Sequence, residues 1–162
     1  MRILYIHGLD SAADPDRIAS LEAAGHEVFA LHLDYRQQPD AYDILRDYAQ
    51  QQRIDYIIGS SLGGALGFWL AEEMGVPCLL FNPAVYLSRP EINIELTAQP
   101  GCPARWVVIG EQDDVVDPAQ SWAFFAQQDQ RQTWQRVIRC QWLGHQIDRA
   151  TFREMQRWAG LG

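Results

Sequence analysis

Short apolar segments alternate with longer segments of helical period along the chain. The apolar segments are nearly continuous runs, which is typical of strands buried on both faces of a parallel sheet. They predict strands over Arg2–His7, Glu27–Leu33, Ile54–Gly59, Pro77–Phe81, Arg105–Gly110 and Trp134–Cys140. The intervening segments predict helices over Pro15–Ala24, Ala41–Gln51, Leu62–Met74, Pro118–Gln128 and Asp148–Ala159.

Residues that commonly begin or end helices support these boundaries. Gly25 follows the first helix, Asp117 precedes Pro118, and Asp148 can cap the last helix. The alternation predicts an α/β fold, in which helices cover both faces of a doubly wound, mostly parallel sheet of about six strands. We expect three layers in a single domain over residues 1–162, with residues 82–102 as the one long irregular segment available for a lid.

The composition excludes several classes of protein. The 162 residues suit one domain, and 13 basic against 21 acidic residues give a net charge of −8. Every basic residue is an arginine, so lysine Schiff bases, pyridoxal phosphate attachment and phosphate loops that end in Gly-Lys are excluded. The arginines are scattered, which argues against nucleic acid or an anionic membrane as a partner.

The cysteines and the apolar runs predict a cytoplasmic protein. Cys78, Cys102 and Cys140 are widely spaced and odd in number, which favours reduced thiols over a disulfide. No run approaches the ~20 apolar residues of a membrane span. The first residues lead directly into a predicted strand, without the pattern of a signal peptide.

A candidate nucleophile lies between the third predicted strand and the next helix. The segment Gly59-Ser60-Ser61-Leu62-Gly63 matches the pattern G-x-S-x-G, with Ser61 at its centre. A serine in so sharp a turn needs residues without side chains two positions away on either side. The turn also places Ser61 at a helix N-terminus, where free N–H groups stabilise developing negative charge.

Four histidines are candidates for the general base. In hydrolases with this serine turn, the histidine follows the last strand, where His145 lies after Gly144. His7 ends the first strand at the same edge of the sheet, but a histidine before a glycine loop usually shapes that loop. His26 and His32 lie beside or within a strand and are interpreted as surface or core residues.

The candidate acid follows the strand that ends at Gly110. Asp117 is explained as a helix cap, and Glu111 lies too close to the strand to reach across. Asp113 and Asp114 remain, and the position of Asp113 three residues past Gly110 favours it. Such an acid holds the far N–H of the imidazole and stabilises its charged form.

The oxyanion hole of this arrangement takes one N–H from the residue after the nucleophile, which is Leu62. The second donor is expected from the loop after the first strand, where Gly8 permits a turn toward the serine and Leu9 supplies the N–H. The alternative for this segment is an ordinary turn.

The chain resembles the α/β-hydrolase superfamily, and more narrowly the small esterase-like proteins of the YqiA/UPF0227 type. The segments that carry the resemblance are LYIHGLDS (Leu4–Ser11), IIGSSLGGALG (Ile57–Gly67), FNPAV (Phe81–Val85), DDVVD (Asp113–Asp117) and Gly144–His145. The resemblance implies a minimal α/β-hydrolase fold with little or no cap domain. It also implies Ser61 as nucleophile, Asp113 as acid, His145 as base, and the backbones of Leu9 and Leu62 as oxyanion donors.

These observations predict a serine hydrolase that cleaves small or short-chain acyl esters without a cofactor or metal. Tyr86, Leu87 and Trp142 lie in loops at the expected edge and are candidates for lining the substrate pocket. Thioesterases and peptidases use the same triad. Two further alternatives are a non-catalytic binding protein on the same fold and a flavodoxin-like nucleotide binder that uses the serine turn.

Overall fold

The computed structural model describes residues 1–86, 92–95, 103–128 and 134–162. Within these residues the strands are β1 (Arg2–Ile6), β2 (Glu27–Ala30), β3 (Tyr56–Ser60), β4 (Cys78–Phe81), β5 (Arg105–Gly110) and β6 (Gln135–Cys140). The helices are α1 (Pro15–Ala23), α2 (Ala41–Gln51), α3 (Leu62–Met74), α4 (Pro118–Gln128) and α5 (Arg149–Trp158). The predicted succession of strands and helices is confirmed.

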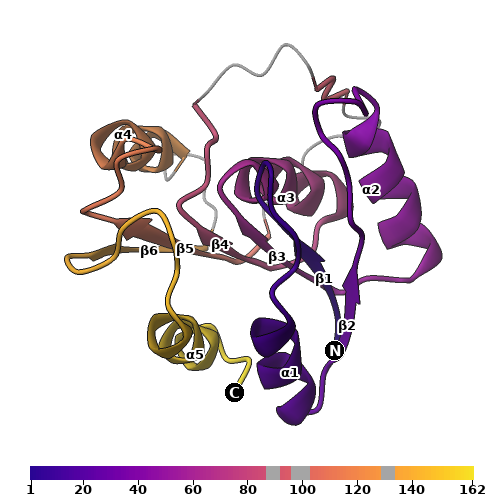
Figure 1. Cartoon of the computed structure of the whole chain (residues 1–162), viewed down its shortest axis with the longest axis horizontal. Coiled ribbons are helices and arrows are strands. Elements are labelled where there is room, and N and C mark those ends of the chain that lie inside the picture. Colours follow the sequence, from indigo (N-terminus) through magenta and orange to yellow (C-terminus); the bar gives the residue numbers. More distant parts are fainter. Residues whose placement is uncertain (87–91, 96–102, 129–133) are drawn as a thin grey trace.

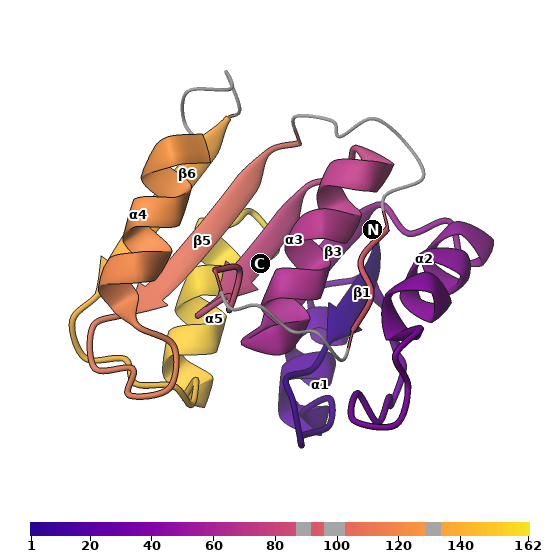
Figure 2. The same ribbon diagram turned by 90° about the horizontal axis from the view of Figure 1, so that it is seen from above.

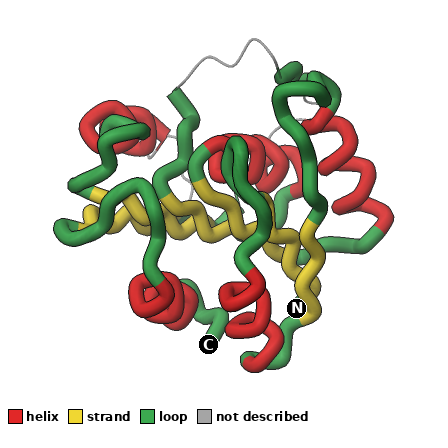
Figure 3. The backbone as a smooth tube through the Cα atoms, viewed as in Figure 1, coloured by secondary structure: helices red, strands yellow, loops and turns green. Residues whose placement is uncertain are grey.

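The strands form one parallel sheet in the order β2-β1-β3-β4-β5-β6. Helices α2, α3 and α4 cover one face, and α1 and α5 cover the other, as Figures 1 and 2 show. Figure 3 shows the strands as the middle layer between these helices. Separate apolar clusters fill the two spaces, one with Leu66 and Phe125 and one with Leu21 and Phe152. The predicted three-layer, doubly wound α/β fold is therefore confirmed.

The register of the sheet brings the residues that follow several strands to one edge. Ile6 of β1 lies beside Gly59 of β3, and Ser60 lies beside Phe81 of β4. Farther along the strand order, Gly110 at the end of β5 lies beside Cys140 at the end of β6. Loops that leave these positions therefore start at the same edge, where ligands bind in folds of this kind.

Some boundaries differ from the prediction by a few residues. β2 ends at Ala30 instead of Leu33, and the Leu33 N–H donates to Nε2 of His7 rather than to a neighbouring strand. β3 begins at Tyr56 because the Ile54 N–H still bonds to Ala49 O at the end of α2. The predicted caps are confirmed, since Asp148 accepts from two N–H groups of α5 and Asp117 from Ala119 N of α4.

The expected lid segment lies only partly within the described residues. Residues 87–91 and 96–102, and with them Leu87 and Cys102, lie outside the described residues. No helix in the part of the chain that is described has the length and apolar character needed to cross a membrane.

Candidate active site

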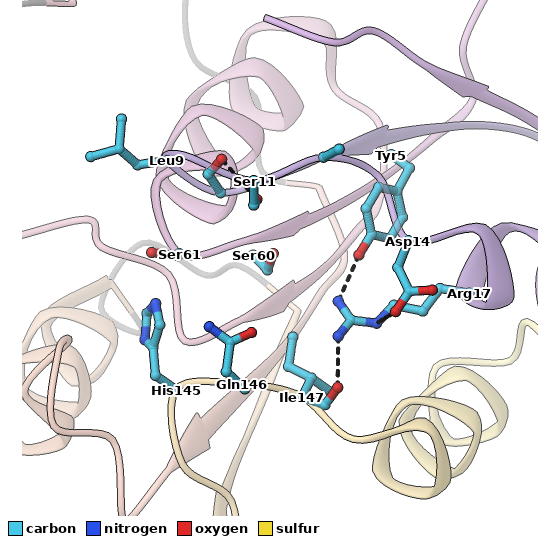
Figure 4. Close-up of a pocket in the computed structure, with 12 residues that line it drawn as sticks. Tyr5, Leu9, Ser11, Asp14, Arg17, Ser60, Ser61, His145, Gln146 and Ile147 are labelled. Carbon is cyan, nitrogen blue, oxygen red and sulfur yellow. Dashed lines mark hydrogen bonds and ion pairs between the residues drawn. The ribbon is translucent and has the colours of Figure 1, made fainter. Parts of the chain in front are cut away.

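Ser61 lies in the sharp turn that joins β3 to α3 (Figure 4). Its backbone has φ +55° and ψ −121°, a conformation that residues other than glycine rarely adopt. A Cβ added at Gly59 would lie 2.3 Å from Gly63 O, and one added at Gly63 would lie 2.2 Å from His7 O. Both glycines are therefore required for the turn to close, as the sequence pattern indicated.

The loop after β1 passes directly beside this serine. A Cβ added at Gly8 would lie 3.3 Å from the Cβ of Ser61. Leu9 lines the same pocket as Ser61, and Leu62 begins α3 as a buried residue. The first N–H groups of a helix have no partner within the helix. The backbones of Leu9 and Leu62 are thus both adjacent to the serine.

Asp113 and His145 are brought together from the loops after β5 and β6. Nδ1 of His145 lies 2.9 Å from Oδ2 and 3.0 Å from Oδ1 of Asp113, whose side chain is only 1% exposed. Oδ1 also accepts hydrogen bonds of 2.8 Å from the N–H groups of Val115 and Val116. A carboxylate can only accept, so Nδ1 carries the proton and Nε2 is left as the acceptor.

The imidazole of His145 points toward Ser61 (Figure 4). Within the described residues the two side chains are not hydrogen-bonded to each other, and such contacts are often loose before substrate binds. Asp114 is exposed at the surface beside Asp113, and the carboxylate that lies against Nδ1 of the histidine is that of Asp113. The structure thus brings together Ser61, His145 and Asp113.

Asn82, the residue after β4, connects the loops that carry Asp113 and His145. Its Oδ1 accepts from Gly110 N at 2.7 Å, and its Nδ2 donates to Gly144 O at 2.9 Å and His145 O at 3.3 Å. The side chain is buried, and the backbone has φ +43°, which asparagine tolerates better than most residues. Asn82 therefore fixes where the His145 loop lies relative to the end of β5.

A pocket of about 180 Å³ opens between the β1 loop, α1 and the His145 loop (Figure 4). Ser61 and His145 lie at one side, Tyr5, Asp14 and Arg17 at the other, and Ser60 and Gln146 between them. The volume is below the roughly 300–1,000 Å³ of pockets for drug-sized ligands. The site therefore suits a small substrate.

Tyr86 and Trp142, two of the expected lining residues, do not line this pocket. The Tyr86 hydroxyl accepts from the N–H of Asp117, beside the acid loop. Trp142 is 57% exposed, and its indole N–H donates to Thr151 Oγ1 at 3.0 Å. The two side chains therefore make their hydrogen bonds outside the pocket, and the prediction that they line it is wrong.

His7, the other candidate base, uses both ring nitrogens in shaping the β1 loop. Nδ1 donates to Gly8 O at 2.7 Å, and Nε2 accepts from Leu33 N at 3.1 Å. Burial lowers the pKa of His7 below its ordinary value, and the neighbouring His32 lowers it further, against the opposite effect of the Gly8 carbonyl. His7 is therefore a neutral residue that supports the loop.

Two residues of the site, Asn82 and Arg17, were missed by reasoning from the sequence. Asn82 had a usable signal, because a polar residue directly after a buried strand lies at the ligand-binding edge. Arg17 had none, since one arginine in an amphipathic helix is ordinarily a surface residue. The direction in which the Arg17 side chain points depends on how α1 is rotated about its axis against the sheet.

The described residues hold no group of three or more histidine, cysteine, aspartate or glutamate side chains arranged to bind a metal ion. Cys78 and Cys140 are both free and buried. Burial raises the pKa of the Cys78 thiol to about 12, so this side chain is un-ionised at neutral pH.

Several solved structures share this fold. An α/β hydrolase enzyme, MGS-M1, from a Medee basin deep-sea metagenome library is 20% identical, with a TM-score of 0.67 over 98% of this chain and 82% of the other. A monoacylglycerol lipase from Paleococcus ferrophilus is 13% identical, with a TM-score of 0.76 over 99% and 95%. Thermogutta terrifontis esterase 2, whose structure was determined after phosphorylation by paraoxon, is 16% identical, with a TM-score of 0.68 over 98% and 79%.

These likenesses establish the α/β-hydrolase fold. None of the curated protein sequences compared with the chain matches it. Residues 2–97, more than half of the chain, match the sequence model of the uncharacterised protein family UPF0227. The protein therefore belongs to the UPF0227 family and has the α/β-hydrolase fold.

Proposed function

We propose that the protein is a serine hydrolase that cleaves small carboxylic esters through an acyl-enzyme. The observation that carries the proposal is the strained turn at Ser61, which shares a small pocket with a histidine held by a buried aspartate. A strained serine conformation must be maintained by the surrounding structure, and such strain is concentrated at functional sites. The esterase and lipase among the solved structures of the same fold support the same class of reaction.

In the proposed mechanism, the Ser61 oxygen attacks the ester carbonyl carbon while His145 Nε2 accepts the serine proton. The negative oxygen of the tetrahedral intermediate is bound by the N–H groups of Leu9 and Leu62, each contributing roughly 10²–10³ in rate. His145 then gives the proton to the leaving alcohol, and the acyl group stays on Ser61. Water repeats the sequence and releases the acid.

Asp113 has two functions in this mechanism. It keeps the proton of His145 on Nδ1, so that Nε2 faces the serine, and it stabilises the imidazolium that forms in each step. The N–H groups of Val115 and Val116 hold its carboxylate in place. The same geometry can cleave oxygen esters, thioesters and amides. A comparison of matched substrates is therefore the experiment that identifies the preferred bond.

The decisive test is labelling with a fluorophosphonate probe, with the modified peptide identified by mass spectrometry. We expect rapid modification of Ser61, no modification in Ser61→Ala, and strongly slowed modification in His145→Ala. Turnover of a matched ester, thioester and amide should be highest for the ester and fall by about 10⁶ in Ser61→Ala. Absence of labelling in a folded sample would refute the proposal and favour a non-catalytic binding protein.

A further inference from the structure

Arg17 places a cation in the wall of the pocket opposite the serine. Its guanidinium extends from α1 between β1 and the His145 loop, and the side chain is 13% exposed (Figure 4). One terminal nitrogen donates to the Tyr5 hydroxyl at 2.9 Å and the other to Ile147 O at 2.6 Å. These bonds hold the group in one orientation.

The hydrogen bonds of Arg17 leave part of its donor capacity unused. A guanidinium has five N–H groups. Within the described residues, each terminal nitrogen makes a single hydrogen bond, so one N–H on each is left without a partner. In Figure 4 the two bonds leave the guanidinium on opposite sides, and the edge between its terminal nitrogens faces Ser60 and Gln146.

Asp14 does not occupy this edge. Its Oδ2 lies 3.4 Å from Nε of Arg17, on the side of the guanidinium that is away from Ser61 in Figure 4. Its Oδ1 accepts from Asp16 N at 2.9 Å as the cap of α1. The carboxylate is therefore engaged behind the guanidinium, and the inward edge stays available to a ligand.

The other groups around this edge also fit a ligand that accepts hydrogen bonds. Ser60 and Gln146 line the pocket with a hydroxyl and an amide, each of which can donate. Burial raises the pKa of the Tyr5 hydroxyl, although Arg17 opposes the effect, so Tyr5 adds no negative charge. Two neighbouring guanidinium N–H groups match the two oxygens of a carboxylate.

We propose that Arg17 forms a subsite for a carboxylate that the ester substrate itself carries, a few bonds from the scissile carbonyl. The inference rests on the proposed function and narrows its substrate class to anionic short-chain esters, such as monoesters of short dicarboxylic acids. The carboxylate binds at the Arg17 edge while the ester carbonyl lies at Ser61.

The kinetic test compares esters that differ only in charge. Monoethyl glutarate carries the carboxylate on the acyl group, and ethyl 4-carbamoylbutanoate is its neutral amide analogue. A second pair, 3-acetoxypropanoate and its amide, places the carboxylate on the alcohol. We expect kcat/KM to be about tenfold or more higher for the charged member of at least one pair, because a charged hydrogen bond is worth this factor. The pair that shows the preference identifies the part of the substrate that binds Arg17.

Arg17→Gln should bring the ratio of kcat/KM for the charged ester to that for its neutral analogue close to one. Arg17→Lys keeps the charge but loses the planar guanidinium with its paired N–H groups, and it should lower this ratio several-fold. Arg149→Gln is the matched control, because Arg149 is 72% exposed, pairs with Asp16 and does not line the pocket. It should retain the wild-type ratio. A ratio near one in the wild type for both pairs, or an unchanged ratio in both Arg17 variants, would overturn the subsite.

Binding to Ser61→Ala separates this inference from the proposed function. Calorimetric titration with monoethyl glutarate should show binding that weakens about tenfold or more when Arg17→Gln is added. That result supports the subsite even where no ester is hydrolysed. If neutral esters are hydrolysed but binding of the anionic ester does not depend on Arg17, the proposed hydrolase function is supported and the carboxylate subsite is refuted.

Discussion

Replacing Asn82 tests whether one buried amide positions the histidine of the site. Asn82→Ala removes the acceptor of the Gly110 N–H and the donor to the carbonyls of Gly144 and His145. Gly110 is buried, whereas Gly144 and His145 are half-buried. The largest penalty is therefore the N–H of Gly110, left without a partner.

The expected loss of stability follows from these contacts. A buried N–H without an acceptor costs about 1–3 kcal/mol. Alanine at φ +43° adds roughly 1 kcal/mol, because it tolerates the left-handed region less well than asparagine. The free energy of unfolding should fall by about 2–4 kcal/mol, which for a chain of this size lowers Tm by about 5–15 °C.

The expected loss of activity is larger than instability alone explains. A shift of about 1 Å in a catalytic group can lower the rate roughly 10²-fold. We therefore expect kcat to fall about that much, with little change in KM, when hydrolysis of a neutral short-chain ester is measured well below Tm. The rate of fluorophosphonate labelling at Ser61 should fall in parallel, since it depends on the same histidine.

Two further variants make the result interpretable. Asn82→Asp keeps the acceptor for Gly110 N–H but turns an oxygen toward two carbonyl oxygens, so it should also lose activity. Asn93→Ala is the matched control, because Asn93 is exposed and is the only other asparagine in the sequence. An Asn82→Ala protein with unchanged Tm and unchanged labelling would refute the positioning role.

Two other predictions concern the acid and the β1 loop. Asp113→Asn should lower kcat/KM roughly 10⁴-fold, while Asp114→Asn, which changes an exposed side chain, should stay near wild type; the reverse result would show that the acid is misassigned. For His7, a folded-state pKa below the ordinary value of about 6.5 means that the unfolded chain binds more protons just below that pH. The free energy of unfolding should therefore decrease as pH falls below about 6.5, and His7→Asn should flatten this dependence in urea melts. His32→Asn should weaken the dependence only in part, because burial lowers the pKa of His7 more than His32 does.

The elements of the fold were predictable because their signals are local. Continuous apolar runs marked the strands, and Asp117 and Asp148 marked helix starts through bonds that span only two or three residues. The largest boundary error, at the end of β2, occurred where a distant partner decides the boundary. β2 ends early because Leu33 N–H bonds to His7, which is 26 residues away in the sequence.

The proximity of Ser61, Asp113 and His145 was predictable for a related reason. Each follows a strand of a parallel sheet, and the register of that sheet brings the strand ends to one edge. The order of the residues along the chain therefore determined that Ser61, Asp113 and His145 would approach one another. The sequence favoured Asp113 over Asp114, and in the structure it is the Asp113 carboxylate that lies beside Nδ1 of His145.

The opposite wall of the pocket could not be predicted because it depends on the packing of a helix. Arg17 lies one helical turn before Leu21 on the same face of α1, so the packing of Leu21 into the core also brings the Arg17 guanidinium to Tyr5 and Ile147. A rotation of α1 by one residue, about 100°, would carry the guanidinium away from the serine and Leu21 out of its place in the core. In the proposed function, the reacting groups therefore come from strand ends, and the group that selects the substrate comes from the orientation of a helix.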